Sequence, residues 1–469
     1  MSKRLILVLA LAFVVGLTFT AYAEVQNVKV SGDITVLGVA RQLELNNSKA
    51  AGTGTTGTYP DTFLASIARV RVDADLTDNV STTVRILNER YWGSETENTG
   101  SVAASSDRNV NTDIDLDLAY VTLKEFLYSP LTMTVGRQEL HFGNEMIVGD
   151  PDTNNAVSSA SPFSNVVGTT SANRLNADLS ARKSFDAIRA TLNYDPLVID
   201  IIGAKIAEAV TNSYDDTNLY GVNAGYDLTK NTKVEAYWFE RNVDRKANTN
   251  INKPTRTDVI GARVSTTPIE NLMYQLEVAY QFGRYNTNTA AQPTVALKAW
   301  ALETSLTYDF KKVKYTPSLT ALYAYFSGDS DNYDTNAGHR RGWDPMYENQ
   351  TFGNIHNVLW NQTNQHIAGI KGSMKPMEDI TLKGEYYGYW LAKRSTNGLV
   401  ATSVARPGQN LVFTKKGGLG QELDVTATYD YTEDVQFSLL TGVYWAGNAL
   451  SNRNDNTATE VIGSMKVTF

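Results

Sequence analysis

The feature that most constrains this chain is a two-residue alternation of apolar and polar side chains, which persists over long segments. In the stretch LMYQLEVAYQF (272–282), one parity carries Leu, Tyr, Leu, Val, Tyr and Phe. In DIDLDLAY (113–120), three aspartates alternate with Ile, Leu, Leu and Tyr. Only a β-strand repeats its side chains every two residues, so each segment predicts a strand with one apolar face.

The length of these segments favours strands that cross a membrane. A strand in a soluble sheet has about 5–6 residues, whereas a tilted transmembrane strand needs about 9–11. About 18 segments of the longer kind can be delimited, an even number that is typical of a single-chain bacterial barrel. The predicted strands lie near residues 26–45, 62–76, 79–92, 112–126, 130–142, 183–194, 196–208, 216–228, 232–243, 255–267, 271–286, 294–310, 312–327, 363–375, 378–392, 418–431, 434–447 and 457–469.

The connections between these segments alternate strictly between tight and long. The tight ones are rich in Asp, Asn and Pro, the residues that form turns. The two longest connections are 143–182 and 328–362. This order predicts an all-β, transmembrane antiparallel β-barrel with short periplasmic turns and long extracellular loops. A barrel this wide is not filled by side chains alone, so we expect the two longest loops to fold inward and narrow it.

The first residues have the pattern of a secretory signal peptide. Lys3 and Arg4 precede an apolar run over 5–19, which is followed by Ala-Tyr-Ala ending at Ala23. A basic start, a short apolar run and an A-x-A site predict cleavage after Ala23. An uncleaved membrane anchor is the alternative. We therefore expect a signal peptide over 1–23 and an outer-membrane barrel domain over 24–469.

Composition excludes several classes of protein. The formal net charge is −8, which argues against a nucleic-acid partner. The chain has no Cys, so disulfides, Cys-ligated zinc and a thiol nucleophile are excluded. It has four His and no Gly-x-Ser-x-Gly elbow, so we predict no enzyme and no cofactor. The acidic stretch 328–336 hints at calcium, but it has Tyr and Asp where a calcium loop needs an oxygen ligand and Gly, so we predict no metal site.

If the apolar parity faces lipid, the opposite parity faces a wet lumen, because an Arg or Lys facing lipid at the midplane costs about 2–4 kcal/mol. The candidate lining and selectivity residues on this parity are Arg69, Arg71, Arg85, Arg189, Arg263, Lys371, Lys383, Asp113, Asp115, Asp117, Glu277 and Glu385. Two interpretations stay open for each of them. The charge either braces the wall through an ion pair or contributes to a ring that selects solutes.

The stretch TVGRQELHFGNEMIVGD (134–150) resembles a motif of the alginate-export family of outer-membrane porins. That motif is Gly-Arg-Gln, then an aromatic-Gly-Asp/Asn step and a further Gly. The matching residues are Gly136, Arg137, Gln138, Phe142, Gly143, Asn144 and Gly149. Shorter matches lie in SFDAIRATL (184–192) and GWDPMYENQTFG (342–353). The 18-stranded barrel of the family agrees with the strand count.

The resemblance implies a channel with a basic pore that attracts a polyanionic polysaccharide, with acidic loop residues as its gate. It also implies that Arg137 and Arg189 line the pore. Strand parity instead places Arg137 on the lipid face, so either a bulge re-aims its side chain or it lies at the rim. The inward parity carries more acids than bases, so the family is a safer inference than alginate as the solute.

Together these patterns predict a passive outer-membrane channel of a Gram-negative bacterium, admitting hydrophilic solutes that include, by resemblance, an anionic polysaccharide. The expected partners are lipid and lipopolysaccharide, the assembly machinery of the outer membrane, and a small or polymeric hydrophilic solute. Phe469, in the last alternating segment, resembles the signal that this machinery reads. An outer-membrane enzyme and a surface adhesin or receptor barrel are the alternatives.

Overall fold

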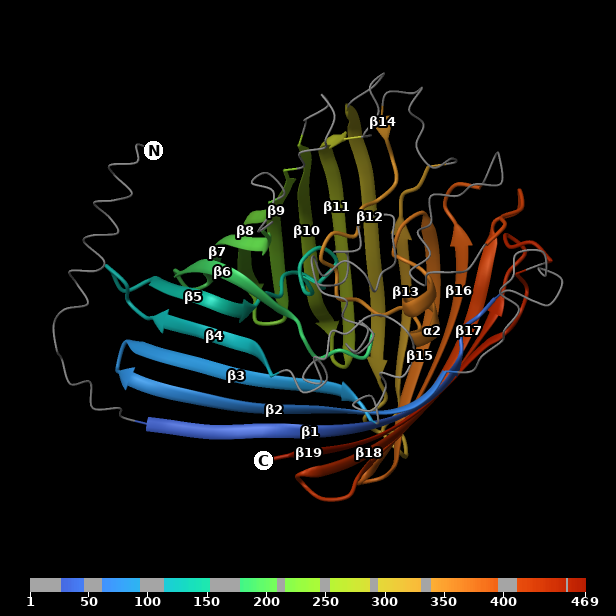
Figure 1. Ribbon diagram of the computed structural model, residues 1–469, viewed down its shortest axis with the longest axis horizontal. Helices are drawn as coiled ribbons and strands as arrows, with labels where there is room; N and C mark the ends of the chain where they lie inside the picture. The colour runs from blue at the N-terminus through green and yellow to red at the C-terminus, as the bar shows by residue number, and fades with distance from the viewer. Residues whose placement is uncertain are drawn as a thin grey trace, which may run out of the picture.

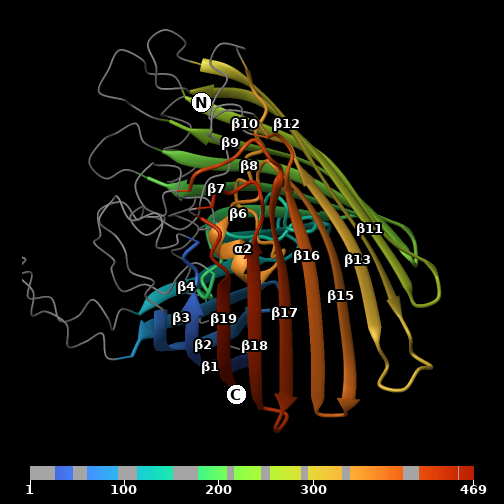
Figure 2. The ribbon, with the colours of Figure 1, turned by 90° about the vertical axis from the view of Figure 1, so that its right-hand side faces the viewer.

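The computed structural model describes residues 27–45, 61–92, 114–151, 178–208, 216–244, 254–286, 294–329, 339–394, 411–452 and 454–469. The expected signal peptide, 1–23, lies outside them, as does Asp113. Eighteen long strands form one antiparallel sheet (Figures 1 and 2). They are β1 (Asn27–Gln42), β2 (Asp61–Thr77), β3 (Val80–Tyr91), β4 (Asp115–Leu123), β5 (Leu131–Glu139), β6 (Ser184–Asn193), β7 (Leu197–Ala207), β8 (Thr217–Thr229), β9 (Thr232–Val243), β10 (Thr255–Ile269), β11 (Leu272–Asn286), β12 (Thr294–Asp309), β13 (Ser318–Phe326), β15 (Gln365–Met377), β16 (Ile380–Leu391), β17 (Gly418–Asp430), β18 (Val435–Ala446) and β19 (Ala458–Thr468).

The sheet closes on itself because β1 pairs with β19 as well as with β2. Closure leaves no free edge, so every strand satisfies its backbone groups within the sheet, as a hydrocarbon environment requires. The predicted β-barrel of about 18 strands is thus confirmed. Within the described residues, no helix is long and apolar enough to cross a membrane.

Two of the predicted strand boundaries were wrong because residues with left-handed backbone angles interrupt the apolar pattern. The strand predicted over 312–327 begins only at Ser318, after Tyr315 and Thr316 adopt left-handed backbone angles. Likewise, β4 ends at Leu123, before Glu125 and Leu127, which have φ angles of 54° and 69°. An L-residue at positive φ cannot continue a strand, and this conformation leaves no trace in hydrophobic periodicity.

Two short elements inside the long connection after β13 were not predicted. The strand β14 (His339–Arg340) pairs in parallel with β12, and the helix α2 (Asn354–Leu359) lies within the barrel (Figure 2). Neither has a period long enough to read from the sequence.

The alternation separates an apolar outer face from a polar inner face. On β11, Val278, Tyr280 and Phe282 expose 40%, 40% and 36% of their surface, whereas Glu277 and Gln281 on the other parity are buried. Aromatic side chains gather on the outer face toward both ends. Tyr308 and Phe310 make a ring contact of 4.7 Å near the turns, and Trp300 and Tyr325 one of 4.3 Å toward the loops. Two such belts are typical of barrels that meet two membrane–water boundaries.

A β-bulge corrects the predicted faces of β4. The register with β3 shifts so that Arg85 pairs with Leu118 while Ile86 pairs with Leu116, which makes Asp117 the extra residue. Leu118 therefore joins the inner face instead of the apolar outer one, and it is buried there. A bulge inserts one residue and flips the parity of everything after it.

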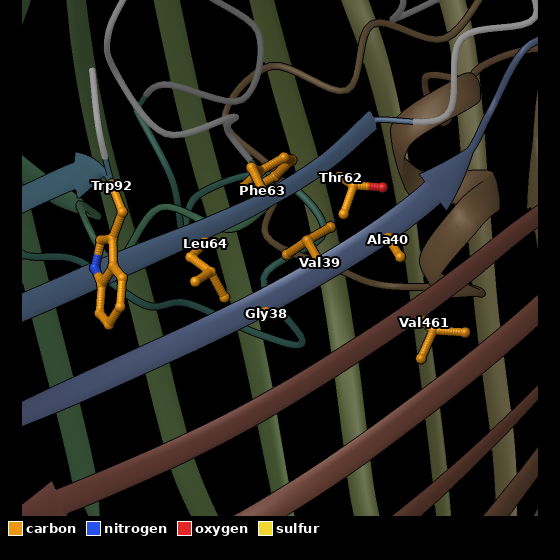
Figure 3. Close-up of a pocket in the computed structure, with 8 residues that line it drawn as sticks. All are labelled: Gly38, Val39, Ala40, Thr62, Phe63, Leu64, Trp92 and Val461. Carbon is orange, nitrogen blue, oxygen red and sulfur yellow. The ribbon is translucent and has the colours of Figure 1, made fainter. Parts of the chain in front are cut away.

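The outer wall has an apolar groove of 460 Å³ where β1, β2 and β19 meet (Figure 3). Gly38 and Ala40 give this part of the wall little side-chain bulk, and Leu64, Trp92 and Val461 flank it. Leu64 and Val461 are exposed on the outer parity, so the groove opens away from the lumen.

Candidate pore and its internal plug

Two segments fold inside the barrel and pack on each other. We call residues 140–151 and 341–364 together the internal plug. The amide of Tyr347 donates to the carbonyl of Ile147 at 3.0 Å, and the amide of Gly149 donates back to the carbonyl of Tyr347 at 2.8 Å. These segments contain most of the described residues of the two longest loops, which were expected to fold inward.

The plug contains large apolar side chains that pack against the inner wall. Trp343 and Trp360 are almost fully buried, and the indole of Trp360 donates to the hydroxyl of Tyr444 on β18 at 3.2 Å. His356 of α2 stacks on Tyr389 of β16 with ring centroids 4.0 Å apart. Burial lowers the pKa of His356 to about 3, so its ring is neutral and has no acid–base role at physiological pH.

Carboxylates of the inner wall hold the plug through its backbone. Glu277 on β11 accepts the amide of Asn144 at 2.7 Å and the hydroxyl of Tyr237 at 2.7 Å. Glu303 on β12 accepts the side-chain amide of Gln350 at 2.5 Å. These acids therefore serve as hydrogen-bond acceptors for a buried loop, which has no regular partners for its own N–H groups.

The first turn of α2 is held in the same way. Glu422 on β17 accepts the amides of Ile355 and His356 at 2.7 and 2.8 Å, and Asp424 accepts the amide of Asn354 at 3.1 Å. The first amides of any helix lack partners inside the helix, so these two carboxylates satisfy them. Both acids are buried.

A buried ion pair anchors the other side of the plug. The guanidinium of Arg241 on β9 bonds both carboxylate oxygens of Asp344. Gln281 on β11 accepts the amide of Asp344 at 2.9 Å and donates to its carbonyl at 2.5 Å. Four strands of the wall, β9, β11, β12 and β17, thus hold the segment 341–364 in place.

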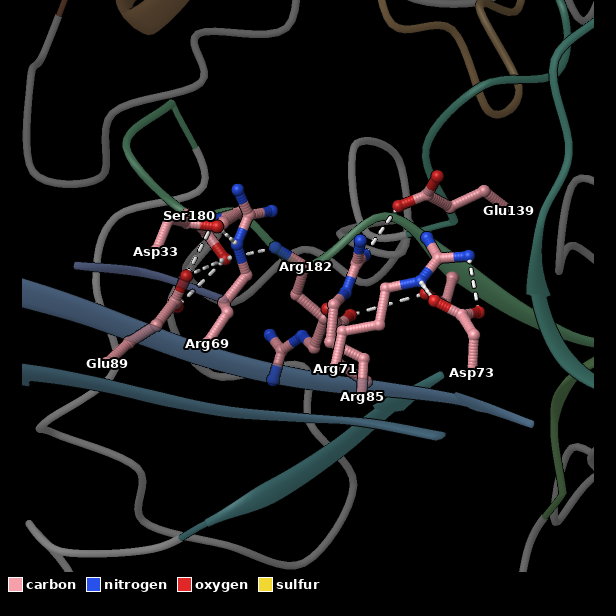
Figure 4. A network of polar contacts seen from close by, with 12 residues as sticks. Asp33, Arg69, Arg71, Asp73, Arg85, Glu89, Glu139, Ser180 and Arg182 are labelled. Atoms are coloured by element: carbon pink, nitrogen blue, oxygen red, sulfur yellow. Dashed lines mark hydrogen bonds and ion pairs between the residues drawn. The ribbon is translucent and has the colours of Figure 1, made fainter. Parts of the chain in front are cut away.

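The wall formed by β1–β4 carries a different arrangement, a row of arginines (Figure 4). Arg69 bonds Asp33 at 2.9 Å, and Arg71 bonds Asp73 at 2.8 Å. Arg85 bonds both Asp117 and Glu139 at 2.5 Å. We call Arg69, Arg71 and Arg85 the arginine row.

A second inward segment covers part of this wall. The amide of Ala181 donates to Glu89 on β3 at 2.6 Å, and Arg182 pairs with Asp115 at 3.4 Å. Arg41 on β1 pairs with Asp178 at 2.8 Å. These loop residues were missed because strand parity assigns faces only inside strands. Arg41 lies within a predicted strand, on the inward parity, and was left out of the candidates.

The remaining candidates are spread around the wall. Arg189 pairs with Asp200 at 2.8 Å and Arg263 with Glu235 at 2.6 Å. Lys371 lies 3.8 Å from Glu385, whereas Lys383 on the same parity of β16 as Glu385 makes no ion pair or hydrogen bond within the described residues. The structure thus brings Asp115, Asp117 and the arginine row together, and separates them from Glu277 across the barrel.

Arg137 lies on the opposite face from the other candidates. Its neighbour Gln138 is buried on the inner side, while Arg137 shares the parity of the exposed Val135 and Ile188 and pairs with Asp186 at 3.1 Å. No register shift occurs between β5 and β6, so no bulge in this pairing turns Arg137 inward. Arg137 instead lies two residues from the loop end of β5, at the rim. We do not retain Arg137 as a lumenal candidate.

One buried acid of the plug predicts a pH dependence. Burial raises the pKa of Glu348 to about 8, although the amide of Gln350 donates to it at 2.8 Å. The docked plug therefore keeps a proton that an undocked loop releases above its ordinary pKa of 4.5. The docked state loses stability as pH rises from that value toward about 8.

We expect channel opening in planar bilayers to become more frequent between about pH 4.5 and about pH 8 in the wild type, because these are the pKa values of the Glu348 carboxyl in the undocked and the docked plug. Glu348→Gln removes the titrating group and should flatten the profile. Glu385→Gln, a wall carboxyl outside the plug, is the matched control and should keep the wild-type profile. An unchanged slope in Glu348→Gln would contradict this assignment.

Comparison with known families matches residues 36–464 to the alginate export family. The chain belongs to the alginate export family. Comparison with curated proteins gives no match. Among solved structures, Acinetobacter baumannii OccAB1 is 12% identical, with 96% of this chain and 99% of that chain covered and a TM-score of 0.55. Pseudomonas aeruginosa OccK3 (OpdO) is 10% identical, with 95% and 96% covered and a TM-score of 0.55.

A third similar structure is Pseudomonas aeruginosa OccK2 (OpdF) in complex with glucuronate, 9% identical, with 95% of this chain and 99% of that chain covered and a TM-score of 0.52. At these identities the likeness concerns the fold alone. Membership of the alginate export family, together with the closed barrel, makes this protein an outer-membrane channel. The family is one of transport proteins, which fits the expectation of no enzyme.

Proposed function

We propose that the protein is a passive channel for hydrophilic anions, with carboxylated sugars, single or polymeric, as the solute class. The observation that carries this proposal is the unequal solvation of inner-wall charges. Glu277 and Glu422 are fully buried under the plug, whereas the side chains of the ion pair Arg71–Asp73 are 38% and 34% exposed. Part of the excess of acids in the sequence is therefore withdrawn from solvent.

Cations near the turn end of the wall support the same reading. Lys383 on β16 and Lys466 on β19 are exposed on the inward parity, and neither has an ion pair or hydrogen bond within the described residues. The half-buried acid Asp73 is instead bonded to Arg71. Unpaired cations at this level raise the local concentration of anions, because a low-dielectric channel focuses the field.

Selectivity measurements in planar bilayers test this proposal. Under a potassium chloride gradient, the reversal potential should show preference for chloride, and Lys383→Glu with Lys466→Glu should move it toward potassium. Lys205→Glu is the matched control, because Lys205 lies on the outer parity of β7 and pairs with Asp216 at 2.8 Å. Cation selectivity in the wild type would overturn the proposal.

The size of the solute is tested separately. Since OccK2 has been solved with glucuronate, glucuronate and a short polyuronate are suitable probes, with a neutral oligosaccharide of equal length as control. Partial block of the current by both uronates, but not by the neutral sugar, is expected. Absence of any conductance would favour the adhesin or receptor interpretation.

We also propose the orientation and processing of the chain. The short turns would face the periplasm and the long loops the exterior, and residues 1–23 would be removed on export. N-terminal sequencing of the protein from outer membranes should then begin at Glu24. Protease treatment of whole cells should cut only in the long connections.

A further inference from the structure

Three cations form an exposed group on the outer face of neighbouring strands. They are Arg256 on β10, Arg284 on β11 and Lys298 on β12, which we call the loop-end cationic patch. In the sheet register Arg256 lies directly opposite Arg284, and Lys298 is two residues along β12 from the residue opposite Arg284. At Cβ, Arg284 therefore lies about 4.5–5.5 Å from Arg256 and about 7–8 Å from Lys298, whereas β11 separates Arg256 from Lys298.

The aromatic belt beneath the patch indicates at which level of the membrane the patch lies. Phe282 and Trp300, both exposed on the outer parity, each lie two residues from a patch cation on the same strand. Aromatic belts lie at the level of the lipid headgroups. The patch is therefore placed at or just beyond this level, where the charged part of a lipid is found.

The charges of the patch are only partly balanced by the protein. Glu240 and Asp258 hold Arg256 at 2.8 and 2.9 Å. Within the described residues, neither Arg284 nor Lys298 has an ion pair or a hydrogen bond. Like charges directly opposite each other destabilise a sheet unless an anion separates them.

Other outer-face cations near the loop end differ in this respect. Arg137 pairs with Asp186 at 3.1 Å, and Lys205 pairs with Asp216 at 2.8 Å. Among these cations of the outer face near the loop end, the two without a partner, Arg284 and Lys298, lie on neighbouring strands on one side of the barrel. The contrast indicates a ligand for the patch, since ordinary surface charges of this wall acquire a partner.

We propose that the loop-end cationic patch binds the phosphate groups of a phosphorylated glycolipid in the outer leaflet. Two guanidinium groups and one ammonium supply charge-assisted hydrogen bonds to phosphate oxygens, while Phe282 and Trp300 contact the sugar and the first part of the acyl chains. The inference uses the orientation proposed above and is independent of the selectivity of the pore.

Native mass spectrometry of the full-length barrel in detergent micelles can test this proposal. The probes are bisphosphorylated lipid A and dephosphorylated lipid A with the same acyl chains. The phosphorylated lipid should bind at least about tenfold more tightly, because each charged hydrogen bond contributes about 1.5–3 kcal/mol. Arg284→Gln with Lys298→Gln should abolish this difference, whereas Arg284→Lys should retain most of it and Lys205→Gln all of it.

Each other outcome would overturn the proposal. Equal binding of the two lipids would mean that acyl chains alone are recognised. Wild-type affinity in the Arg284→Gln and Lys298→Gln double variant would place the phosphate elsewhere. Equal affinity for soluble glucosamine 1,6-bisphosphate would indicate a site for free phosphate instead of a lipid. Heat-modifiable migration on gels confirms that each variant is folded before binding is measured.

Discussion

Replacing residues 344–362 by two glycines is expected to raise single-channel conductance several-fold. The deletion removes the buried Tyr347, Ile355 and Trp360 from the interior of the barrel. Its ends already lie together, because the hydroxyl of Thr363 donates to the carbonyl of Trp343 at 2.6 Å. The barrel itself should persist, since its strands are paired around the whole circumference without this loop.

A subtler variant separates the anchors from the plug itself. Glu422→Gln with Asp424→Asn keeps the plug but weakens the acceptors of the first three backbone amides of α2. A buried donor left without a partner costs about 1–3 kcal/mol, so we expect frequent transitions to the larger conductance. Asp186→Asn, on the outer parity, is the matched carboxylate-to-amide control. A folded deletion variant with wild-type conductance would show that solutes pass elsewhere.

Phe469→Ala is expected to lower the amount of folded barrel in the outer membrane about tenfold, on the view that this residue secures the seam between β19 and β1 and is read by the assembly machinery. The amide of Gly32 donates to the carbonyl of Phe469 at 2.8 Å, and the amide of Phe469 donates back to Gly32 at 3.0 Å. The ring of Phe469 covers Gly32, where an added Cβ would lie 2.6 Å from its Cζ.

Met465→Ala is the matched control for this variant, because Met465 is another exposed apolar side chain on the outer parity of β19. Heat-modifiable migration and the yield from outer-membrane fractions measure the outcome. Refolding of both proteins from denaturant into detergent distinguishes the two roles of Phe469. A defect seen only in cells indicates lost recognition by the machinery, and a defect in both indicates a weakened seam. Equal yields of Phe469→Ala and wild type would contradict both roles.

The barrel could be predicted because its determinants are local. A two-residue period, turn residues and segment length can all be recognised within stretches of about a dozen residues. They predict a strand over 216–228, and the structure has β8 at Thr217–Thr229. Where the prediction was wrong, as at Tyr315 and Leu118, the cause was a backbone conformation or a bulge. Neither changes the hydrophobic pattern.

The candidate pore could be predicted only in part. Parity placed the arginine row on the inner face of the barrel, where it lies. It could not reveal that Glu277 accepts a hydrogen bond from the amide of Asn144, 133 positions away along the chain. It also gave every inward charge equal weight. Burial under the plug makes these charges unequal, and burial depends on which loop covers which strand.

The two-residue alternation was enough to predict a closed barrel with one apolar face, since each strand encodes its own two faces. What fills the barrel, and which charges remain solvated, depends on contacts that form only in the folded molecule. The physical reason is that an irregular loop such as 341–364 has no period of its own. Its position follows from long-range contacts, such as those of Ile355 with Glu422 and of Asp344 with Arg241, which exist only once the wall has closed.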